Sequence, residues 1–462
     1  MDEPACPGCA ALRKEVDALR AQVADLTRKL SDALRAGKRQ AAPFRKGPPK
    51  AQPKTPGRKA GEQHGTHGHR PPPPPDQIHE RYEAPLPDAC PHCHENALVE
   101  TGTAEQFQTE IPRTPIHRKF TVHLGRCRCC GKAVQGRHEL QTSDALGAAA
   151  SQIGSDAQAA ATDLHTRFGL SHGKVATIFD TLFGIKLTRG ASCQIGLRTA
   201  TKLAPDYQLI LDDLKASTMI VPDETGWHVG GQLAWLHVGV GDRVTAYTID
   251  SQRSAEVLAK ILGGDWSGIL THDGWSSYEA CFPHAIHQQC VGHVLRRARD
   301  LLATATGGAV HFPQRVIALF GEAIHLRNRY WLGEVTLKHL ENQREVFDDR
   351  LLKLAGVPRV VPEYQTFANH LMNHFEQWFP FVFEPKIEPT NWQAEQAIRP
   401  AVVNRKVWGG NRTENGAKAQ GVLMSVIETC RRGAHSVLDH LAGTLRSFGN
   451  SLLPRPALLP AR

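Results

Sequence analysis

Two short apolar runs, each leading into an aspartate, place the strongest constraint on the fold of this chain. Asp223 follows Met219-Ile220-Val221, and Asp273 follows Gly268-Ile269-Leu270 at a distance of three residues. Runs this short and this apolar are typical of buried strands. A third acid, Glu395, lies in a segment with a helical pattern. Three carboxylates brought together in this way suit two magnesium ions that act on a phosphodiester.

The acids fit a particular order of strands. Strands are predicted at residues 217–221, 233–240, 243–249, 269–272 and 285–289. Three successive strands followed by two more in a β-α-β context are the order of the ribonuclease-H-like fold. In that order the first acid lies on the first strand and the second lies just past the fourth. Because those strand ends are neighbours, we expect Asp223 and Asp273 to lie side by side.

The chain of 462 residues is longer than one core normally serves, so we predict a multidomain α/β protein. Its first half divides into a coiled coil (1–35), a basic proline-rich linker (36–85), a four-cysteine zinc-binding domain (86–140) and a helical, helix-turn-helix-like domain (141–205). A ribonuclease-H-like catalytic domain (206–304 and 386–432) follows, interrupted by a helical insertion (305–385) and ending in a C-terminal tail (433–462).

The N-terminal segment has a leucine-valine heptad pattern from Leu12 to Leu30. Valine at position a and leucine at position d favour a parallel dimer, although an amphipathic helix packed on its own chain would show the same pattern. Cys6 and Cys9 precede the heptads and are either half of a zinc clasp between two chains or an exposed reduced pair.

Basic charge is concentrated in one segment. The formal net charge is +9, and residues 35–70 hold ten Lys or Arg against a single acid, Glu62. A concentrated basic arm favours a polyanionic partner such as nucleic acid, while a merely soluble linker is the alternative. The chain start lacks a secretory pattern, and no apolar run reaches the length of a membrane span. We therefore expect a cytoplasmic protein without a membrane partner.

The eleven cysteines include pairs with metal-ligand spacing. In a cytoplasmic chain such pairs indicate metal rather than disulfides. Cys90, Cys93, Cys127 and Cys130 are predicted to hold one structural zinc ion, with Cys129 as a competing ligand. A closed site of this kind would fold the module and would not catalyse a reaction.

A helical segment follows at residues 144–205. An alanine-rich helix is expected over 148–161, and Gly169-Leu170-Ser171 interrupts the pattern before a second helix that Ser171 can cap. Helix, glycine turn and helix are the outline of a helix-turn-helix, but also of any small helical bundle.

Several features surround the predicted acids. Glu224 should point to the opposite face of its strand from Asp223, so it is left out of the metal set. Cys290 and His293 form a C-x-x-H pair that binds zinc or locks the fifth strand to the next helix. Pro400 is expected to end or kink the helix that carries Glu395. Glu414 and Glu428 are alternative third acids.

The ordered phrases resemble the transposases of the bacterial insertion-sequence family numbered sixty-six. The resemblance covers nearly the whole chain: the heptads, the four cysteines, the helical segment, Asp-Glu-Thr-Gly at 223–226, Asp-Gly-Trp-x-x-Tyr at 273–278, Cys-Val-Gly-His at 290–293, the Ala394-Glu395 helix, and the stretch from Arg405 to Thr429. One departure is Trp392, where the family pattern usually has a second asparagine.

The resemblance implies a DDE recombinase that binds two Mg²⁺ (or Mn²⁺) ions through Asp223, Asp273 and Glu395. Water would first free a 3′-OH at the transposon end, and that hydroxyl would then attack target DNA. Basic residues near the acids, and one in the helical segment, are expected to contact DNA: Arg399, Arg405, Lys406, Arg412 and Lys174.

A homodimer or higher oligomer is expected through the N-terminal coiled coil. The resemblance implies small accessory proteins, and a DNA-acting protein of this kind is expected at the bacterial nucleoid. Two other functions fit parts of the sequence. A zinc-dependent DNA-binding regulator fits the cysteines and heptads but gives no reason for three separated carboxylates. A nuclease without strand transfer shares the acids.

Overall fold

The computed structural model describes residues 71–111, 114–448 and 453–459, together with Val16, Gln22 and Val23. The heptad segment as a whole, Cys6 and Cys9, and most of the basic linker lie outside these residues. The chain divides into two compact units, Met1–Pro112 and Arg113–Arg462. Within residues 71–111 the regular secondary structure is the short 3-10 helix η2 (Pro75–Gln77).

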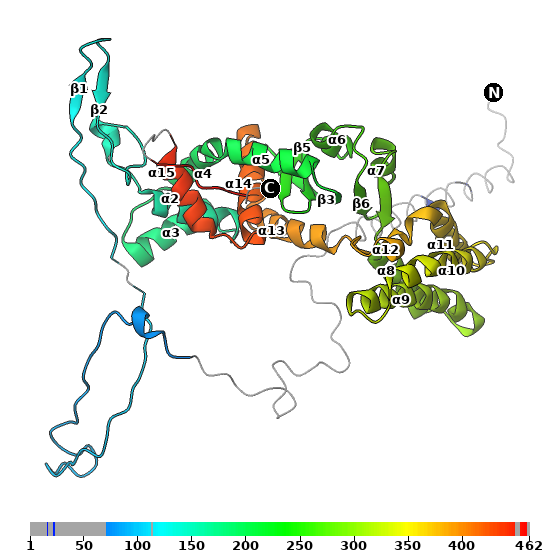
Figure 1. Ribbon diagram of the computed structural model, residues 1–462, viewed down its shortest axis with the longest axis horizontal. Coiled ribbons are helices and arrows are strands. Elements are labelled where there is room, and N and C mark those ends of the chain that lie inside the picture. Colours follow the sequence, from blue (N-terminus) through cyan, green and yellow to red (C-terminus); the bar gives the residue numbers. More distant parts are fainter. Residues whose placement is uncertain (1–15, 17–21, 24–70, 112–113, 449–452, 460–462) are drawn as a thin grey trace, which may run out of the picture. The chain divides into compact units, whose positions relative to one another are not determined.

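A mixed five-stranded sheet lies at the centre of the second unit (Figure 1). Its strands are β3 (Met219–Val229), β4 (Gln232–Val240), β5 (Thr245–Asp250), β6 (Ile269–His272) and β7 (Ile286–Gln289). Their order is β5-β4-β3-β6-β7, with β3, β4 and β5 antiparallel and β3, β6 and β7 parallel. The five predicted strands are therefore present, with Asp223 on the first and Asp273 directly after the fourth.

β3 is longer than predicted. It was expected to end at Val221, but β4 pairs with it as far as Val229. Gly230 and Gly231 follow with φ of 58° and 83°, the left-handed conformation of a tight hairpin that keeps the two strands paired to their ends. Asp223 thus lies inside a strand and is held by the ladder.

The pairing between β3 and β6 is much shorter. It covers Met219 with Ile269 and Ile220 with Leu270. β3 then continues with β4 alone, and β6 continues with β7 up to His272. Pro222, which has no backbone N–H to donate, lies just after the last β3–β6 pair. The two aspartates therefore lie beyond a fork in the sheet.

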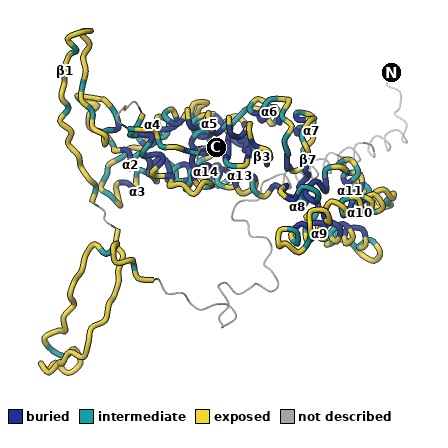
Figure 2. Tube along the Cα trace, viewed as in Figure 1, coloured by how far each residue is buried: buried dark blue, intermediate teal, exposed yellow. Residues whose placement is uncertain are grey.

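Helices cover both faces of the sheet (Figures 1 and 2). α13 (Trp392–Trp408) and part of α14 (Glu414–Arg432) bury the face that carries Val221 and Trp227. α5 (Ala204–Lys215), α6 (Glu256–Leu262) and α7 (Ser276–Cys281) bury the other face. Because side chains alternate along a strand, Asp223 shares the face of Val221 and faces α13, while Glu224 faces α7.

α13 does not end at Pro400, which was one of the two predicted outcomes, but runs through it to Trp408. The proline removes one backbone hydrogen bond. The helix nevertheless continues because Ala394, Ala397 and Ala401 are buried against β3 and β4 on both sides of the proline.

The helical insertion has a core of its own. Within the predicted bounds it contains η4 (Gly307–Val310), α9 (His311–Trp331), α10 (Leu337–Ala355), α11 (Pro362–Asn373), η5 (Phe375–Gln377) and α12 (Pro380–Phe383). α8 (Val291–Thr304), predicted as part of the catalytic domain, packs its buried Val291, Val294 and Ala298 into the same core. Aromatic rings fill that core, with Phe320 and Phe347 both stacked on Phe379. No helix in the described part of the chain is long and apolar enough to cross a membrane.

The segment before the sheet contains β1 (Leu124–Arg126), β2 (Ala133–Gln135), η3 (Gly147–Ala150), α2 (Ser155–Thr166), α3 (His172–Phe183) and α4 (Arg189–Lys202). The helix expected from residue 148 begins only at Ser155, after Gly154. Ser171 caps α3 as predicted, accepting from the N–H of Lys174 at 3.3 Å. The predicted tail contains α15 (Val437–Ser447), whose buried Leu441 and Leu445 form part of a packed helix.

One end of α13 is fixed to the turn between α2 and α3. Asn404 donates from Nδ2 to the carbonyl of Thr166 at 2.8 Å, and the ring of Trp408 stacks on His165 with 5.1 Å between centroids. Gly169 approaches the same asparagine closely. It has a φ of 70°, and a Cβ there would lie 2.3 Å from Oδ1 of Asn404.

We predict that Gly169→Ala destabilises the protein by about 1–3 kcal/mol, because it adds both backbone strain and a clash with Asn404. Urea unfolding measures this free energy. Gly184→Ala is the matched control, since Gly184 also has a positive φ (65°) but its Cβ would meet no atom within 4 Å. If both variants lower the free energy of unfolding equally, the close approach to Asn404 contributes nothing to the loss of stability.

Candidate active site

Asp223 is the centre of an acidic cluster. Its side chain projects from β3, and the N–H of Glu224 donates to its Oδ1 at 2.9 Å. The pKa of Asp223 is raised to about 7, mainly by burial and then by the negative charges of Glu224, Asp273 and Glu395. The three acids predicted from sequence are thus near enough to one another for their charges to interact.

Asp273 is exposed in the turn after β6 and accepts from the N–H of Trp275 at 3.1 Å. Gly274 shapes this turn with a φ of 92°, and a Cβ there would lie 2.4 Å from the side-chain oxygen of Gln289. The N–H of Gly274 also donates to Nδ1 of His272 at 3.2 Å. The backbone N–H groups of Gly274 and Trp275 therefore fix the turn that carries Asp273.

A histidine pair, of which His272 is buried and His287 half-buried, supports this turn, and sequence reasoning missed it. Nε2 of His272 lies 3.0 Å from Nδ1 of His287, whose Nε2 lies 2.9 Å from the carbonyl of Phe282. Burial, followed by the charges of His287 and His374, lowers the pKa of His272 to about 3. Neutral His272 can then accept from Gly274 and donate to His287. The residues are 15 positions apart, so no local pattern joins them.

Glu395 lies in the first turn of α13, with its side chain 44% exposed. Its Oε1 is 3.8 Å from Nε2 of His293, in the first turn of α8. The start of α13 is tied to the same place, because the N–H of Asn391 donates to Sγ of Cys290 at 3.4 Å. These contacts tie the start of α13 to the start of α8. They differ from the lock predicted for Cys290 and His293, which was to join the fifth strand to the helix after it.

The donor set of the cluster fits divalent cations. Carboxylate oxygens are the ligands that magnesium prefers. Carboxylates that lie close together raise one another's pKa, and the charges of Glu224, Asp273 and Glu395 have this effect on Asp223. Among the residues that the structure describes, no three His, Cys, Asp or Glu side chains converge closely enough to hold a metal ion. Binding would therefore require the acids to draw closer around the cations.

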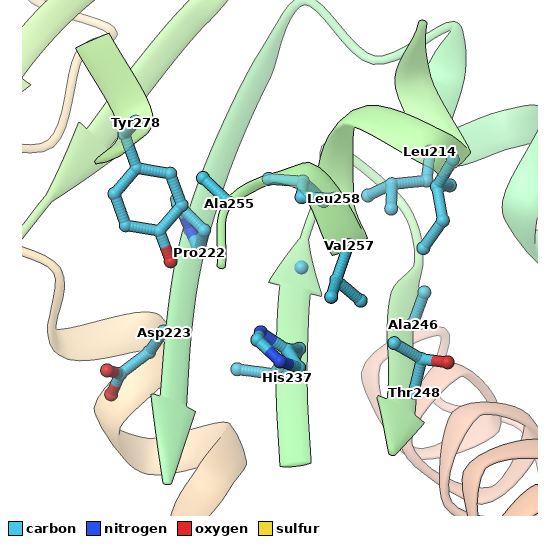
Figure 3. Close-up of a pocket in the computed structure, with 13 residues that line it drawn as sticks. Leu214, Pro222, Asp223, His237, Ala246, Thr248, Ala255, Val257, Leu258 and Tyr278 are labelled. Atoms are coloured by element: carbon cyan, nitrogen blue, oxygen red, sulfur yellow. The ribbon is translucent and has the colours of Figure 1, made fainter. Parts of the chain in front are cut away.

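The space behind Asp223 is too small for a substrate. A cavity of ≈ 10 Å³, room for about one water molecule, lies against β3, β4, β5 and α6 (Figure 3). Asp223, His237, Thr248 and Tyr278 are among the residues that line it. Any larger molecule that reaches Asp223 therefore has to approach from the open side, where Asp273 and Glu395 are exposed.

The basic residues predicted to contact DNA differ in their surroundings. Arg399, Lys406, Arg412 and Lys174 are exposed. Arg405 is only half-buried but donates from Nη1 to the carbonyl of Gly226 and, at 3.4 Å, to the hydroxyl of Thr225. Burial lowers its pKa. Its guanidinium therefore holds α13 against β3.

Each predicted zinc-binding pair lies on a tight turn. Backbone N–H groups of Cys93 and His92 lower the pKa of the Cys90 thiol, and those of Cys130 and Cys129 do the same for Cys127. Gly131, with a φ of 69°, lets the second turn close between β1 and β2. N–H groups directed at sulfur favour the thiolate, the form that binds zinc.

Comparison with known proteins agrees with this geometry. Residues 151–419 match the model of the transposase IS66 family, a span that includes Asp223, Asp273 and Glu395. The chain belongs to this family. It is also 23% identical over 297 residues to the uncharacterized protein y4qI of Sinorhizobium fredii. That alignment covers 57% of this chain and 53% of y4qI, so the chain matches about half the length of this relative.

The raised pKa of Asp223 has a consequence for stability. Its folded-state pKa of about 7 lies above the ordinary value of about 3.9 for an unfolded aspartate. Between these values the unfolded chain is ionised while the folded protein holds a proton, so stability falls as pH rises through this window.

We therefore predict that Asp223→Asn raises the melting temperature of the metal-free protein at pH 8 by about 2–4 °C, the shift expected for roughly 1 kcal/mol. Thermal denaturation with a chelator at pH 5 and pH 8 measures it, and the gain should be smaller at pH 5. Exposed Asp212, changed to Asn, is the control. A lower melting temperature for Asp223→Asn at pH 8 would contradict the electrostatic account.

Proposed function

We propose that this protein is a DDE transposase that cleaves transposon ends and joins their 3′-OH groups to target DNA by two-metal phosphodiester transfer. The observation that carries the proposal is the convergence of three carboxylates from β3, the turn after β6, and α13, near enough that the charges of Asp273 and Glu395 add to the effect of burial on the pKa of Asp223. The strand order supports a ribonuclease-H-like catalytic domain with the helical insertion between β7 and α13.

The three acids have different freedom to move. Asp223 is held in a paired strand, Asp273 in a glycine turn, and Glu395 on a half-exposed helix start. When bound, two Mg²⁺ ions would activate the attacking oxygen and stabilise the leaving 3′ oxygen. Asp223 would have to release its proton to take up a cation, and Glu395 is the acid with the most room to close on one.

DNA contact is proposed for two surfaces. Exposed Arg399, Lys406 and Arg412 lie on α13 and after it, downstream of Glu395. Lys174 lies on α3, in a three-helix unit that could bind transposon ends. Side chains of this kind usually contact phosphates and set position rather than sequence. We assign Arg405 to the support of β3, because its donors are directed at Thr225 and Gly226.

Further parts of the proposal concern assembly. One zinc ion held by Cys90, Cys93, Cys127 and Cys130 would fold the segment before the helices. The heptads of residues 1–35 would join two chains, as their a and d residues favour. Small accessory proteins are a further proposed partner, on the basis of family membership.

The transposase proposal predicts loss of chemistry from three substitutions. Asp223→Asn, Asp273→Asn and Glu395→Gln should each lower joining of donor ends to a supercoiled plasmid by at least about 10²-fold, since loss of a metal ligand should cost no less than loss of its support. Joint molecules in Mg²⁺, separated on a gel, measure this.

Glu414→Gln is the matched control, because Glu414 is an exposed acid that also lies at a helix start. Retained joining by Glu395→Gln, with loss in Glu414→Gln, would show that the third acid is misassigned. Cut ends without joint molecules from the unchanged protein would indicate a nuclease, and neither product would indicate a DNA-binding regulator.

The zinc proposal predicts a change in metal content. Cys127→Ser with Cys130→Ser should remove about one zinc ion per chain, because two of four thiolate ligands are lost. Atomic absorption of the purified protein measures it, with Cys193→Ser as control for a cysteine outside the pairs. Unchanged zinc in the double variant would contradict the assignment.

A further inference from the structure

Because β3 and β6 separate before they reach Asp223 and Asp273, side-chain contacts and not backbone pairing must set the distance between the two aspartates. Backbone pairing ends at Ile220 and Leu270, three residues before Asp223 and Asp273. Carboxylates that are held near one another repel. Something other than the ladder must therefore hold the two segments together.

Glu224 makes contacts that span this fork. Its side chain is 2% exposed, and its two oxygens have different partners. Oε2 accepts from the hydroxyl of Tyr278 at 3.0 Å, and Oε1 accepts from Nε and Nη2 of Arg253 at 3.1 and 3.0 Å. Tyr278 lies on α7, five residues after Asp273, so the first bond joins the neighbour of one acid to the segment of the other.

The hydroxyl of Tyr278 is suited to remain a hydrogen-bond donor to Glu224. It is 3% exposed, and Figure 3 shows its hydroxyl directed toward β3. Burial and then the charge of Glu224 raise its pKa well above the ordinary value, so the hydroxyl keeps its proton. A fully protonated phenol and a buried carboxylate form a charge-assisted hydrogen bond of the stronger kind.

Arg253 completes a second link across the same gap. Its guanidinium lies 4.8 Å from the ring centre of Trp235 on β4 and 5.0 Å from that of Trp275, two residues after Asp273. One group therefore contacts Glu224 next to the first acid and Trp275 next to the second. Stacking on two indole rings fixes a side chain that is otherwise 48% exposed.

We propose that Glu224, Arg253 and Tyr278 form a clamp that sets the separation of Asp223 and Asp273, with Glu224 a positioning residue and not a metal ligand. The inference rests on the proposed two-metal function and deepens it. All donors to Glu224 approach from the side of α7 and the β5–α6 loop, while Asp223 faces α13. The carboxylate of Glu224 is thus already committed to protein partners.

Metal binding tests the clamp apart from catalysis. Calorimetric titration of the full-length protein with Mn²⁺ gives a dissociation constant, and melting temperature reports folding. Tyr278→Phe and Arg253→Gln should each weaken Mn²⁺ binding by about tenfold, the lower range for loss of a group that orients ligands. The half-saturating Mn²⁺ concentration for cleavage of a donor-end duplex should rise by the same factor.

Matched controls make the same chemical changes elsewhere. Tyr207→Phe removes a hydroxyl that donates to the carbonyl of Tyr247 at 2.9 Å. Arg350→Gln removes an arginine bonded to Glu322 at 2.6 Å in the insertion. Both should bind Mn²⁺ like the unchanged protein. Equal Mn²⁺ affinity in the clamp variants and these controls would overturn the clamp, whatever their melting temperatures.

Glu224→Gln separates positioning from coordination. The amide keeps an oxygen for Arg253 and an N–H₂ that can donate to Tyr278, so Mn²⁺ affinity should stay within about threefold, whereas Glu224→Ala should lose about tenfold. A loss in Glu224→Gln as large as in Asp223→Asn would make Glu224 a ligand and overturn the proposal.

The aspartate variants distinguish two kinds of failure. If Asp223→Asn and Asp273→Asn bind Mn²⁺ as well as the unchanged protein, the proposed metal site fails and the clamp with it. If they lose binding while Tyr278→Phe and Arg253→Gln do not, the clamp alone is wrong.

Discussion

Mutual repulsion among partly buried carboxylates is the constraint on which the rest of the active region depends. Asp223, Asp273 and Glu395 come from three elements, and their proximity alone is unfavourable without a cation. Each element is therefore fixed by contacts on its other side. β3 is held by the long ladder to β4, the Asp273 turn by His272 and Gly274, and α13 by its buried alanine face.

The three acids are not held equally firmly, and this difference affects how they can bind cations. The two aspartates lie on or directly after strands, while Glu395 lies at a helix start reached only after the insertion. Its side chain is 44% exposed and lies 3.8 Å from Nε2 of His293, so it is held less firmly than the two aspartates. A site with two fixed ligands and one adjustable ligand can accept cations without moving the sheet.

Much of this arrangement was predictable from the sequence because local patterns encode it. Apolar runs before Asp223 and Asp273 indicated buried strands, and alternation placed Glu224 on the opposite face. The length of β3 was missed because Val221 precedes a proline and an acid, which usually mark a strand end, whereas the Gly230–Gly231 turn and β4 extend the pairing. Whether α13 ends at Pro400 could not be decided from the sequence for a similar reason, since its burial against the sheet has no local signature.

The contacts that support the acids had no such pattern. Glu224 meets Arg253 and Tyr278 across 29 and 54 residues, and His272 meets His287 across a helix and a turn. Arg253 lies in a loop whose sequence gives no hint of two tryptophan rings around it. Only the fold brings these side chains together, so their roles follow from structure and not from spacing.

The unbroken course of α13 through Pro400 joins two regions mechanically. Its first turn carries Glu395, and its last turns hold Asn404 and Trp408 against the α2–α3 turn. Because these contacts hold one end of the helix, a rotation at that end also moves the other end. Any tilt of α2 and α3 relative to the sheet must therefore break those contacts or move the carboxylate of Glu395. In this way α13 couples the helices before the sheet to the acidic cluster.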